Sequence, residues 1–299
     1  MSTKLVLGSR GSALALAQVD LFQKALRTVV PELEIDIKII TTTGDKRLDI
    51  SMARESGEGL KGLFTREIET VLLAGGIDVA VHSLKDLPGR LPPGVEVAAV
   101  LERARTQDIF ISKAGHRFSE LPQAAVVATS SVRRKRQLQW KRPDLQFEEI
   151  RGNVPTRLNK LRASEKWAGI VLAQAGIDRL GLDLSGFHVE VLKTLPAIGQ
   201  AAIGLEIRSG DFAAAGILAK INHTPTFLRI RAERELLRLL NGDCHLPVGV
   251  ETAITGERLR MKTIIFWEEN QPPLIGEIEG RADEPETLAN QLYLQIYGA

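Results

Sequence analysis

The chain has 299 residues, 39 of them Lys or Arg and 37 Asp or Glu, so its formal net charge is +2 at pH 7. This near balance excludes a strong overall attraction to nucleic acid or membranes, and any anion-binding site must therefore be local. The 44% hydrophobic and 25% charged residues are typical of a globular protein, and the length indicates about two or three domains.

Cysteine usage and the amino-terminal sequence bear on the cellular compartment. A single cysteine, Cys244, excludes a disulfide within the chain and fits a reducing compartment. Met1–Arg10 carries no long apolar stretch after a basic region, and no run approaches the roughly 20 apolar residues of a membrane span. We therefore expect a cytoplasmic protein that has no membrane partner.

The first third of the chain alternates between strand and helix patterns. Strands are expected at Lys4–Leu7, Ile35–Ile39 and Ile77–Val81, and helices at Leu14–Leu26 and Phe64–Leu73. Such alternation predicts a mostly parallel sheet with helices packed on it.

The middle of the chain repeats this alternation. Further strands are expected at Val95–Leu101, Ile109–Ile111, Ala125–Ala128, Phe147–Ile150, Ile170–Ala173 and Ala202–Ile207. Helices are expected to begin after Ser131 and to cover Val154–Leu161. The pattern predicts an α/β protein with two lobes.

From Thr224 the composition changes to a long charged helix that is expected to end near Asn241. Short strands are expected around Val250–Ile254 and Met261–Phe266, followed by a helix over Glu284–Tyr297. This segment predicts a third domain of the α+β class.

Polar residues follow several predicted strands at the point where each strand gives way to a helix. They are Ser9-Arg10-Gly11-Ser12, Ser83-Leu84-Lys85-Asp86, Thr129–Arg134 and Arg151-Gly152-Asn153. Open parallel sheets bind ligands beyond the carboxyl ends of their strands. Helix amino termini and arginine forks both favour carboxylate or phosphate groups. We therefore expect an oligo-anionic ligand between the lobes. The turn Gly8-Ser9-Arg10-Gly11 does not form the dinucleotide pattern G-x-G-x-x-G, and the sequence has no Walker-type pattern, which disfavours nicotinamide and ATP chemistry.

Each of these residues also has an ordinary structural interpretation. The basic run Arg133–Arg136 is typical of a solvated helix face, and Asp86 is typical of a turn acid. Cys244 is also explained as a small buried hydrophobe, although His245 beside it suggests thiolate activation. Nucleic-acid binding at the basic run is disfavoured, because aromatic residues are not interleaved with it and zinc-ligand spacing is absent.

Taken in order, the motifs of the chain resemble those of the hydroxymethylbilane synthase (porphobilinogen deaminase) family along nearly the entire length. The motifs that carry the resemblance are Gly8–Ser12 with Leu14-Ala15 and Gln18, Thr43-Gly44-Asp45, Lys61–Phe64, Val79–Pro88, Thr129–Arg134, Arg151–Leu158, Leu195–Gln200 and Gly242–Gly249. One motif alone would carry little weight, but the ordered set is specific.

The resemblance implies a fold of three domains. Two lobes are expected to look like type II periplasmic binding proteins with the active cleft between them, and a third, α+β domain is expected to carry the cofactor cysteine. The expected bounds are 1–101 with 200–219 for the first domain, 102–199 for the second and 220–299 for the third. The family also implies a monomer.

The resemblance further implies a cofactor, a substrate and the residues that hold them. The cofactor is a dipyrromethane, built from two substrate pyrroles and joined by a thioether to Cys244. The side chains expected to hold the cofactor are Lys85, Asp86, Ser131, Arg133 and Arg134. Those expected to bind porphobilinogen are Arg10, Ser12, Gln18, Lys61, Arg151, Arg157, Arg179 and Gln200. The acetate and propionate groups of each pyrrole suit the planar fork of arginine, and no metal is implied.

The implied reaction condenses four porphobilinogen units with loss of ammonia and then releases linear hydroxymethylbilane by hydrolysis. Positive charge develops on pyrrole nitrogen, and the carboxylate of Asp86 is expected to stabilise it and to assist proton transfer.

The chain departs from the usual family pattern in two places. Gly59-Leu60 stands where Gly-Gly is common, which bears on the role of Lys61. Arg105-Thr106-Gln107-Asp108 stands where Asp-Pro-Arg-Asp is frequent, which bears on the hinge between the lobes. The alternative function is a non-catalytic two-lobe binding protein for a small anion, which leaves Cys244 unexplained.

Overall fold

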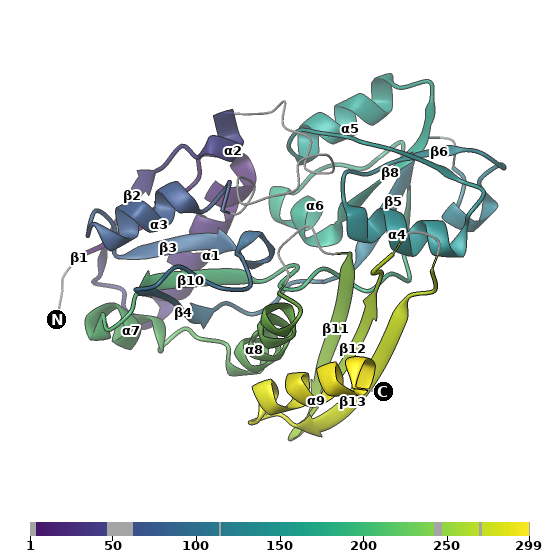
Figure 1. Ribbon diagram of the computed structural model, residues 1–299. Helices are drawn as coiled ribbons and strands as arrows, with labels where there is room; N and C mark the ends of the chain where they lie inside the picture. Colours follow the sequence, from purple (N-terminus) through teal and green to yellow (C-terminus); the bar gives the residue numbers. More distant parts are fainter. Residues whose placement is uncertain (1–3, 47–61, 114, 242–246, 269–270, 299) are drawn as a thin grey trace.

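The computed structural model describes residues 4–46, 62–113, 115–241, 247–268 and 271–298. Within these residues the strands form three sheets, two of five strands and one of three. Figure 1 shows the two larger sheets in separate α/β lobes that lie side by side, with the smallest sheet and its helices below them. No helix in the described ranges has the length and apolar character needed to cross a membrane.

The first lobe is built on a sheet of strand order β2-β1-β3-β10-β4. Its strands are β1 (Lys4–Ser9), β2 (Glu34–Ile39), β3 (Val79–Ser83), β4 (Val95–Val100) and β10 (Ile203–Arg208). The helical elements of this lobe are α1 (Ala13–Val29), α2 (Thr43–Lys46), α3 (Arg66–Leu73), η2 (Leu84–Asp86) and α7 (Phe212–Leu218). The buried side chains of Phe22 and Leu26 on α1 pack against Leu7 and Val79 of the sheet, which explains the apolar period seen in the sequence.

The second lobe is built on a sheet of strand order β7-β6-β8-β5-β9. Its strands are β5 (Asp108–Ser112), β6 (Val126–Ala128), β7 (Gln146–Glu148), β8 (Trp167–Ala173) and β9 (His188–Val191). The helical elements are η3 (Phe118–Glu120), α4 (Val132–Lys141), α5 (Val154–Ala163) and α6 (Gln174–Leu180). The predicted α/β class of both lobes is therefore confirmed.

One strand in each large sheet runs against the other four. Strand β10 pairs antiparallel with β3 and β4, and β5 pairs antiparallel with β8 and β9. The remaining pairings in both sheets are parallel, so the expectation of mostly parallel sheets holds with one exception in each. The reversed strands are the first ones after the chain crosses between lobes, at residues 101–107 and again at 192–202.

The carboxyl-terminal unit packs two helices on a three-stranded antiparallel sheet. Its elements are α8 (Thr224–Leu239), β11 (Val248–Thr255), β12 (Arg258–Ile265), β13 (Leu274–Arg281) and α9 (Pro285–Tyr297). Strand β13 was not expected from the sequence, because Gly276 and Gly280 weaken its strand pattern. Both glycines lie under α9, where a Cβ would come within 2.8 Å of Leu292 and 2.6 Å of Leu288 respectively.

A buried ion pair ties both crossing segments to α8. The guanidinium of Arg103 donates to both carboxylate oxygens of Glu233 at 2.5 and 3.0 Å, and its Nε donates to the carbonyl of Gln200 at 2.8 Å. The backbone N–H of Gly199 donates to the same carboxylate at 2.9 Å. Burial alone would raise the pKa of Glu233, but Arg103 and these hydrogen bonds hold this pKa below its ordinary 4.5.

A second buried carboxylate, Asp108, lies where the first crossing enters β5. It accepts hydrogen bonds from Arg133 at 2.8 Å, from Arg134 at 3.0 Å and from Gln200 at 3.0 Å, and from the hydroxyl of Thr194 at 3.0 Å. Burial opposes its ionisation, but the two guanidinium groups outweigh that effect and hold the pKa of Asp108 well below its ordinary 3.8. Asp108 therefore joins the start of β5, helix α4 and the second crossing segment.

We predict that Glu233→Ala lowers the free energy of unfolding by about 3–5 kcal/mol, because Arg103 is then left buried without its carboxylate. Urea denaturation monitored by circular dichroism measures the loss. Glu279→Ala serves as the control, since its pair with Arg258 is half exposed, and it should cost less than about 1 kcal/mol. Equal losses of unfolding free energy in the two variants would show that the buried pair of Arg103 and Glu233 is no more important for stability than an exposed one.

We also predict that the stabilising effect of Asp108 disappears in acid. Its pKa is lower in the folded state than the ordinary 3.8, so its contribution is complete above that value and is lost as pH falls through the folded-state pKa. The difference in unfolding free energy between the wild type and Asp108→Asn should therefore narrow below about pH 4. A difference that stays constant on acidification would show that the charge of Asp108 contributes nothing.

Candidate active site

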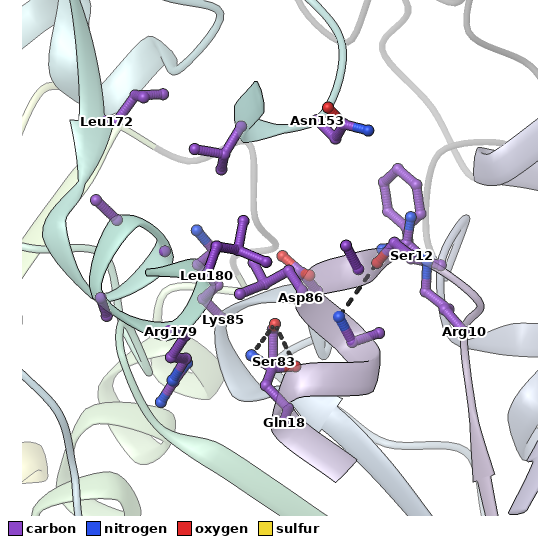
Figure 2. Close-up of a pocket in the computed structure, with 18 of the residues that line it drawn as sticks. Arg10, Ser12, Gln18, Ser83, Lys85, Asp86, Asn153, Leu172, Arg179 and Leu180 are labelled. Carbon is purple, nitrogen blue, oxygen red and sulfur yellow. Dashed lines mark hydrogen bonds between the residues drawn. The ribbon is translucent and has the colours of Figure 1, made fainter. Parts of the chain in front are cut away.

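A cavity of about 480 Å³ opens between the two lobes. The first lobe contributes the turn from β1 to α1 and the end of β3, and the second lobe contributes the amino terminus of α5 and the junction of β8 with α6. Figure 2 shows Arg10, Ser83 and Asp86 on one side and Asn153 and Leu172 on the other. The volume falls in the range of roughly 300–1,000 Å³ that small-molecule sites occupy.

The cavity lining has more cationic than anionic side chains. Its basic side chains are those of Arg10, Lys85, Arg134, Arg151, Arg157 and Arg179, and its carboxylates are those of Asp45, Asp86 and Glu149. Asp45 pairs with Arg10 at 2.5 Å and Glu149 pairs with Arg151 at 2.9 Å. The lining therefore suits a ligand that carries several carboxylates.

Asp86 and Lys85 are placed by the short helix η2 at the end of β3. Leu84, which begins this helix, is buried and packs closely on the second crossing segment and on β10. A Cβ on Gly199 would lie 2.9 Å from the Leu84 side chain, and a Cβ on Gly204 would lie 2.3 Å from it. These two glycines therefore allow η2 to pack closely on the second crossing segment and on β10. This packing positions Asp86 in the cavity lining (Figure 2).

Three cations of the lining influence one another. Burial lowers the pKa of Arg157 to about 10, and the charge of Arg134 adds to the shift. Burial also lowers the pKa of Lys85, with further lowering from Arg134 and Arg157 and opposition from Asp86 and Asp108. Since each shift disfavours the charged form, an anionic ligand would stabilise the charged form of all three groups.

Arg179 carries an unsatisfied donor at the cavity wall. Its Nη2 donates to the carbonyl of Ala201 at 2.7 Å, whereas its buried Nε has no hydrogen-bond partner among the described residues. A buried donor without a partner costs about 1–3 kcal/mol.

Neutral polar residues line the same part of the cavity. The amide of Gln18 and the hydroxyl of Ser83 exchange hydrogen bonds at 2.8 and 3.1 Å (Figure 2). The hydroxyl of Ser12 caps α1 by accepting from the N–H of Ala15 at 3.3 Å, and Asn153 caps α5 in the same way. The capped helix amino termini therefore face the cavity from both lobes.

The structure brings most of the predicted site residues together. Those that line the cavity are Arg10, Ser12, Gln18, Lys85, Asp86, Arg134, Arg151, Arg157 and Arg179. Cys244 and Lys61 lie outside the described residues, as does the departure at Gly59-Leu60. The departure at 105–107 lies in the first crossing segment.

Three predicted site residues do not line the cavity. Arg133 and Gln200 are buried and donate to Asp108 instead, and Arg133 also donates to the carbonyl of Leu195 at 2.6 Å. Ser131 is the N-cap of α4, where its hydroxyl accepts from the N–H of Arg134 at 3.4 Å. In this structure these residues support Arg134 and do not face the cavity.

Sequence reasoning missed several lining residues. Asp45 and Phe64 belong to motifs that were noted without a role, and Glu149 stands two residues before Arg151. Their positions depend on long-range packing, which strand-end patterns do not report. Among the described residues, no group of three His, Cys, Asp or Glu is arranged to hold a metal ion.

Two family models match the chain. Residues 5–215 match "Porphobilinogen deaminase, dipyromethane cofactor binding domain", and residues 227–298 match "Porphobilinogen deaminase, C-terminal domain". The porphobilinogen deaminase of Desulforudis audaxviator is 44% identical over 297 residues, which cover 99% of this chain and 95% of that protein. The porphobilinogen deaminase of Syntrophomonas wolfei is 42% identical over 289 residues, covering 96% and 93% respectively.

Solved structures give weaker likenesses. The methionine binding protein MetQ has a TM-score of 0.45 and 12% sequence identity, covering 78% of this chain and 90% of that chain. The periplasmic VFT2 domain of Bordetella pertussis BvgS has a TM-score of 0.43 and 13% identity, covering 73% and 86% respectively.

The family resemblance seen in the ordered motifs is therefore confirmed by matches that extend along nearly the whole sequence. The cofactor-binding domain model alone covers residues 5–215, more than half of the chain. On these matches, the chain belongs to the porphobilinogen deaminase (hydroxymethylbilane synthase) family.

Proposed function

We propose that the cavity between the lobes is where porphobilinogen units are joined, with loss of ammonia, to give the linear tetrapyrrole hydroxymethylbilane. The family is one of transferase enzymes that carry a dipyrromethane cofactor. The observation that carries the proposal is the carboxylate of Asp86 in a cavity where cations from both lobes outnumber carboxylates. Cations suit the substrate carboxylates, and one carboxylate suits a developing positive charge.

The described residues fit a dipyrromethane, which would bring several carboxylates into the cavity. Lys85 and Arg134 lie at the cavity wall with lowered pKa values, and both would gain from a bound anion. We infer that these two side chains hold the cofactor directly, and that Ser131 and Arg133 act by fixing Arg134. When bound through a thioether to Cys244, the cofactor supplies the free pyrrole carbon to which the first substrate unit is joined.

Substrate carboxylates would bind to arginines from both lobes. Arg10 comes from the turn after β1, Arg151 and Arg157 come from the start of α5, and Arg179 comes from α6. We infer that Ser12 and Gln18 add neutral hydrogen bonds, and Lys61 remains a proposed ligand. Gln200 contributes by holding Asp108, because its amide already donates there.

Asp86 performs the electrostatic part of the reaction in this proposal. Loss of ammonia from porphobilinogen leaves positive charge that is shared with the pyrrole nitrogen. A carboxylate within hydrogen-bond reach of that N–H stabilises the charge and can accept the proton released when the new bond forms. Lys85 lies beside it in the cavity lining, and the charge of Asp86 opposes the lowering of the pKa of Lys85 by burial.

We also propose the domain bounds 1–101 with 200–219, 102–199 and 220–299. Each of the three sheets falls within one of these units, including β10, which rejoins the first sheet from the second crossing. We propose that the protein is cytoplasmic, since a lone cysteine that must form a thioether is best kept in a reducing compartment. We also propose a monomer, as the family resemblance implies. No nucleic-acid partner is proposed, because the formal net charge is only +2.

The alternative function is a two-lobe protein that binds a small anion without catalysis. The cationic cavity would fit such a role, but the role gives no reason for Asp86 or for a cysteine anchor. The two experiments below separate the functions.

We predict that the intact mass of purified protein exceeds the sequence mass by two porphobilinogen-derived pyrrole units. Cells that make porphobilinogen should yield this adduct on the wild type, and Cys244→Ser should carry none. Electrospray mass spectrometry of the denatured protein measures it. An unmodified wild type that gains no mass on addition of porphobilinogen would exclude the enzymatic function.

We predict that Asp86→Asn lowers kcat for hydroxymethylbilane formation by about 10²–10³-fold, the usual effect of removing one electrostatic catalytic group. The variant should keep its fold and its cofactor mass, because the side chain stays similar in shape. Asp20→Asn, on the exposed face of α1, is the control and should retain full activity. Turnover near the wild-type rate in Asp86→Asn would refute the catalytic role.

A further inference from the structure

Arg10 is held at the cavity wall by a carboxylate from the next strand–helix junction. Its Nη2 donates to Oδ1 of Asp45 at 2.5 Å, and its Nε donates to the same oxygen at 3.1 Å and to Oδ2 at 3.3 Å. Both side chains are 24% exposed, so the pair is partly withdrawn from water. An arginine fixed through Nε and one Nη has lost most of its rotational freedom.

Asp45 is itself fixed by the turn that contains it. Its Oδ2 accepts from the N–H of Thr42 at 3.1 Å and from the hydroxyl of Thr42 at 2.8 Å. Against the effect of burial, hydrogen bonds from Arg10 and Thr42 hold the pKa of Asp45 below its ordinary 3.8. The carboxylate is therefore ionised at neutral pH and cannot move away without breaking its bonds to the turn.

The same turn places an aromatic surface under the guanidinium. The guanidinium carbon of Arg10 lies 4.3 Å from the ring centroid of Phe64, a cation–π contact. The ring packs so tightly on the turn that a Cβ at Gly44 would lie 2.2 Å from it. The N–H of Gly44 also donates to the carbonyl of Leu63 at 2.8 Å. Glycine is thus required at position 44 for the ring and the turn to meet.

Helix α3 anchors the turn from its other side. Glu67 accepts from the N–H of Thr43 at 2.8 Å and also from its hydroxyl. Asp45, Phe64 and Thr43 therefore belong to one rigid unit that surrounds a single arginine. The motifs Thr43-Gly44-Asp45 and Gly62-Leu63-Phe64 therefore both contribute to holding Arg10.

The hydrogen-bonding capacity of Arg10 leaves room for a ligand. A guanidinium carries five N–H donors, and Asp45 uses donors on Nε and Nη2 alone. No described residue accepts a hydrogen bond from Nη1 of this side chain, which lines the cavity. A group oriented before binding loses less entropy when it forms a hydrogen bond with a ligand.

We propose that Asp45 is a positioning residue for substrate recognition, which fixes Arg10 against Phe64 so that its Nη1 edge meets a carboxylate of the substrate. This inference rests on the proposed function, in which Arg10 binds porphobilinogen. Asp45 acts through Arg10 and does not touch the substrate. It is not a competitor that must leave before substrate binds, since its second oxygen remains bound to Thr42.

The experiment measures KM and kcat for porphobilinogen in the cofactor-loaded protein, with loading checked by intact mass. We expect Asp45→Asn to raise KM about tenfold and to leave kcat within about twofold, because binding is weakened and the reacting atoms are not touched. Asp45→Glu should recover part of the affinity, since it keeps a carboxylate. Thermal melting of each variant shows that the fold is intact.

Asp144→Asn is the matched control. Asp144 pairs with Arg142 at 2.6 Å, with side-chain exposures of 27% and 22% that resemble those of the Asp45 pair. Neither residue of the control pair lines the cavity. We expect its kinetic constants to equal those of the wild type, so a general effect of losing one Asp–Arg pair is separated from the effect at Arg10.

A double-mutant cycle tests whether Asp45 acts through Arg10. In an Arg10→Lys background, Asp45→Asn should add almost nothing to the rise in KM, because lysine has no fork to orient. Independent effects in the cycle, or an unchanged or lower KM in Asp45→Asn, would overturn the proposal. An unchanged KM in Arg10→Lys would overturn it as well. Absence of turnover in the loaded wild type would instead mean that the proposed function itself had failed.

Discussion

Asp108 is the carboxylate on which the arrangement of cations depends. Without it, Arg133 and Arg134 would stand side by side in the interior with no opposite charge, an arrangement that costs several kcal/mol. With it, Arg133 becomes part of the interior and Arg134 reaches the cavity wall. Asp108 therefore neutralises Arg133 in the interior and orients Arg134 at the cavity wall, where it can bind an anion.

The same principle extends to the connection between the lobes. Glu233 binds Arg103 of the first crossing and Gly199 of the second, and Gln200 binds Asp108. Both crossings are thus joined to α8 and to α4 by buried charges and hydrogen bonds. The contacts of Gly199 and Gln200 lie in the second crossing segment, which also packs on Leu84. The position of Asp86 therefore depends on this segment as well as on β3.

The strand and helix patterns predicted the lobes, the strand ends and the polar residues that follow the strands, because those features depend on local periodicity and on the general geometry of α/β sheets. Gln18, Arg157 and Arg179 came from the family resemblance alone. The sequence could not show that β5 and β10 run antiparallel to their neighbours. The direction of each strand depends on where the chain enters the sheet after it crosses between the lobes. The sequence also could not separate Arg133 from Arg134. Adjacent residues on a helix differ by about 100° in direction. Both arginines are buried against Asp108, but only Arg134 also lines the cavity.

The carboxylates near the cavity relate to the arginines in three different ways. Asp108 neutralises two of them in the interior, while Asp45 and Glu149 each hold one at the wall. Asp86 instead follows Lys85 in a short helix whose end faces the cavity. A site that only bound polycarboxylates would gain from replacing Asp86 with a neutral residue, because its charge repels the ligand. Its retention is explained if positive charge appears on the ligand during reaction, which condensation with loss of ammonia provides.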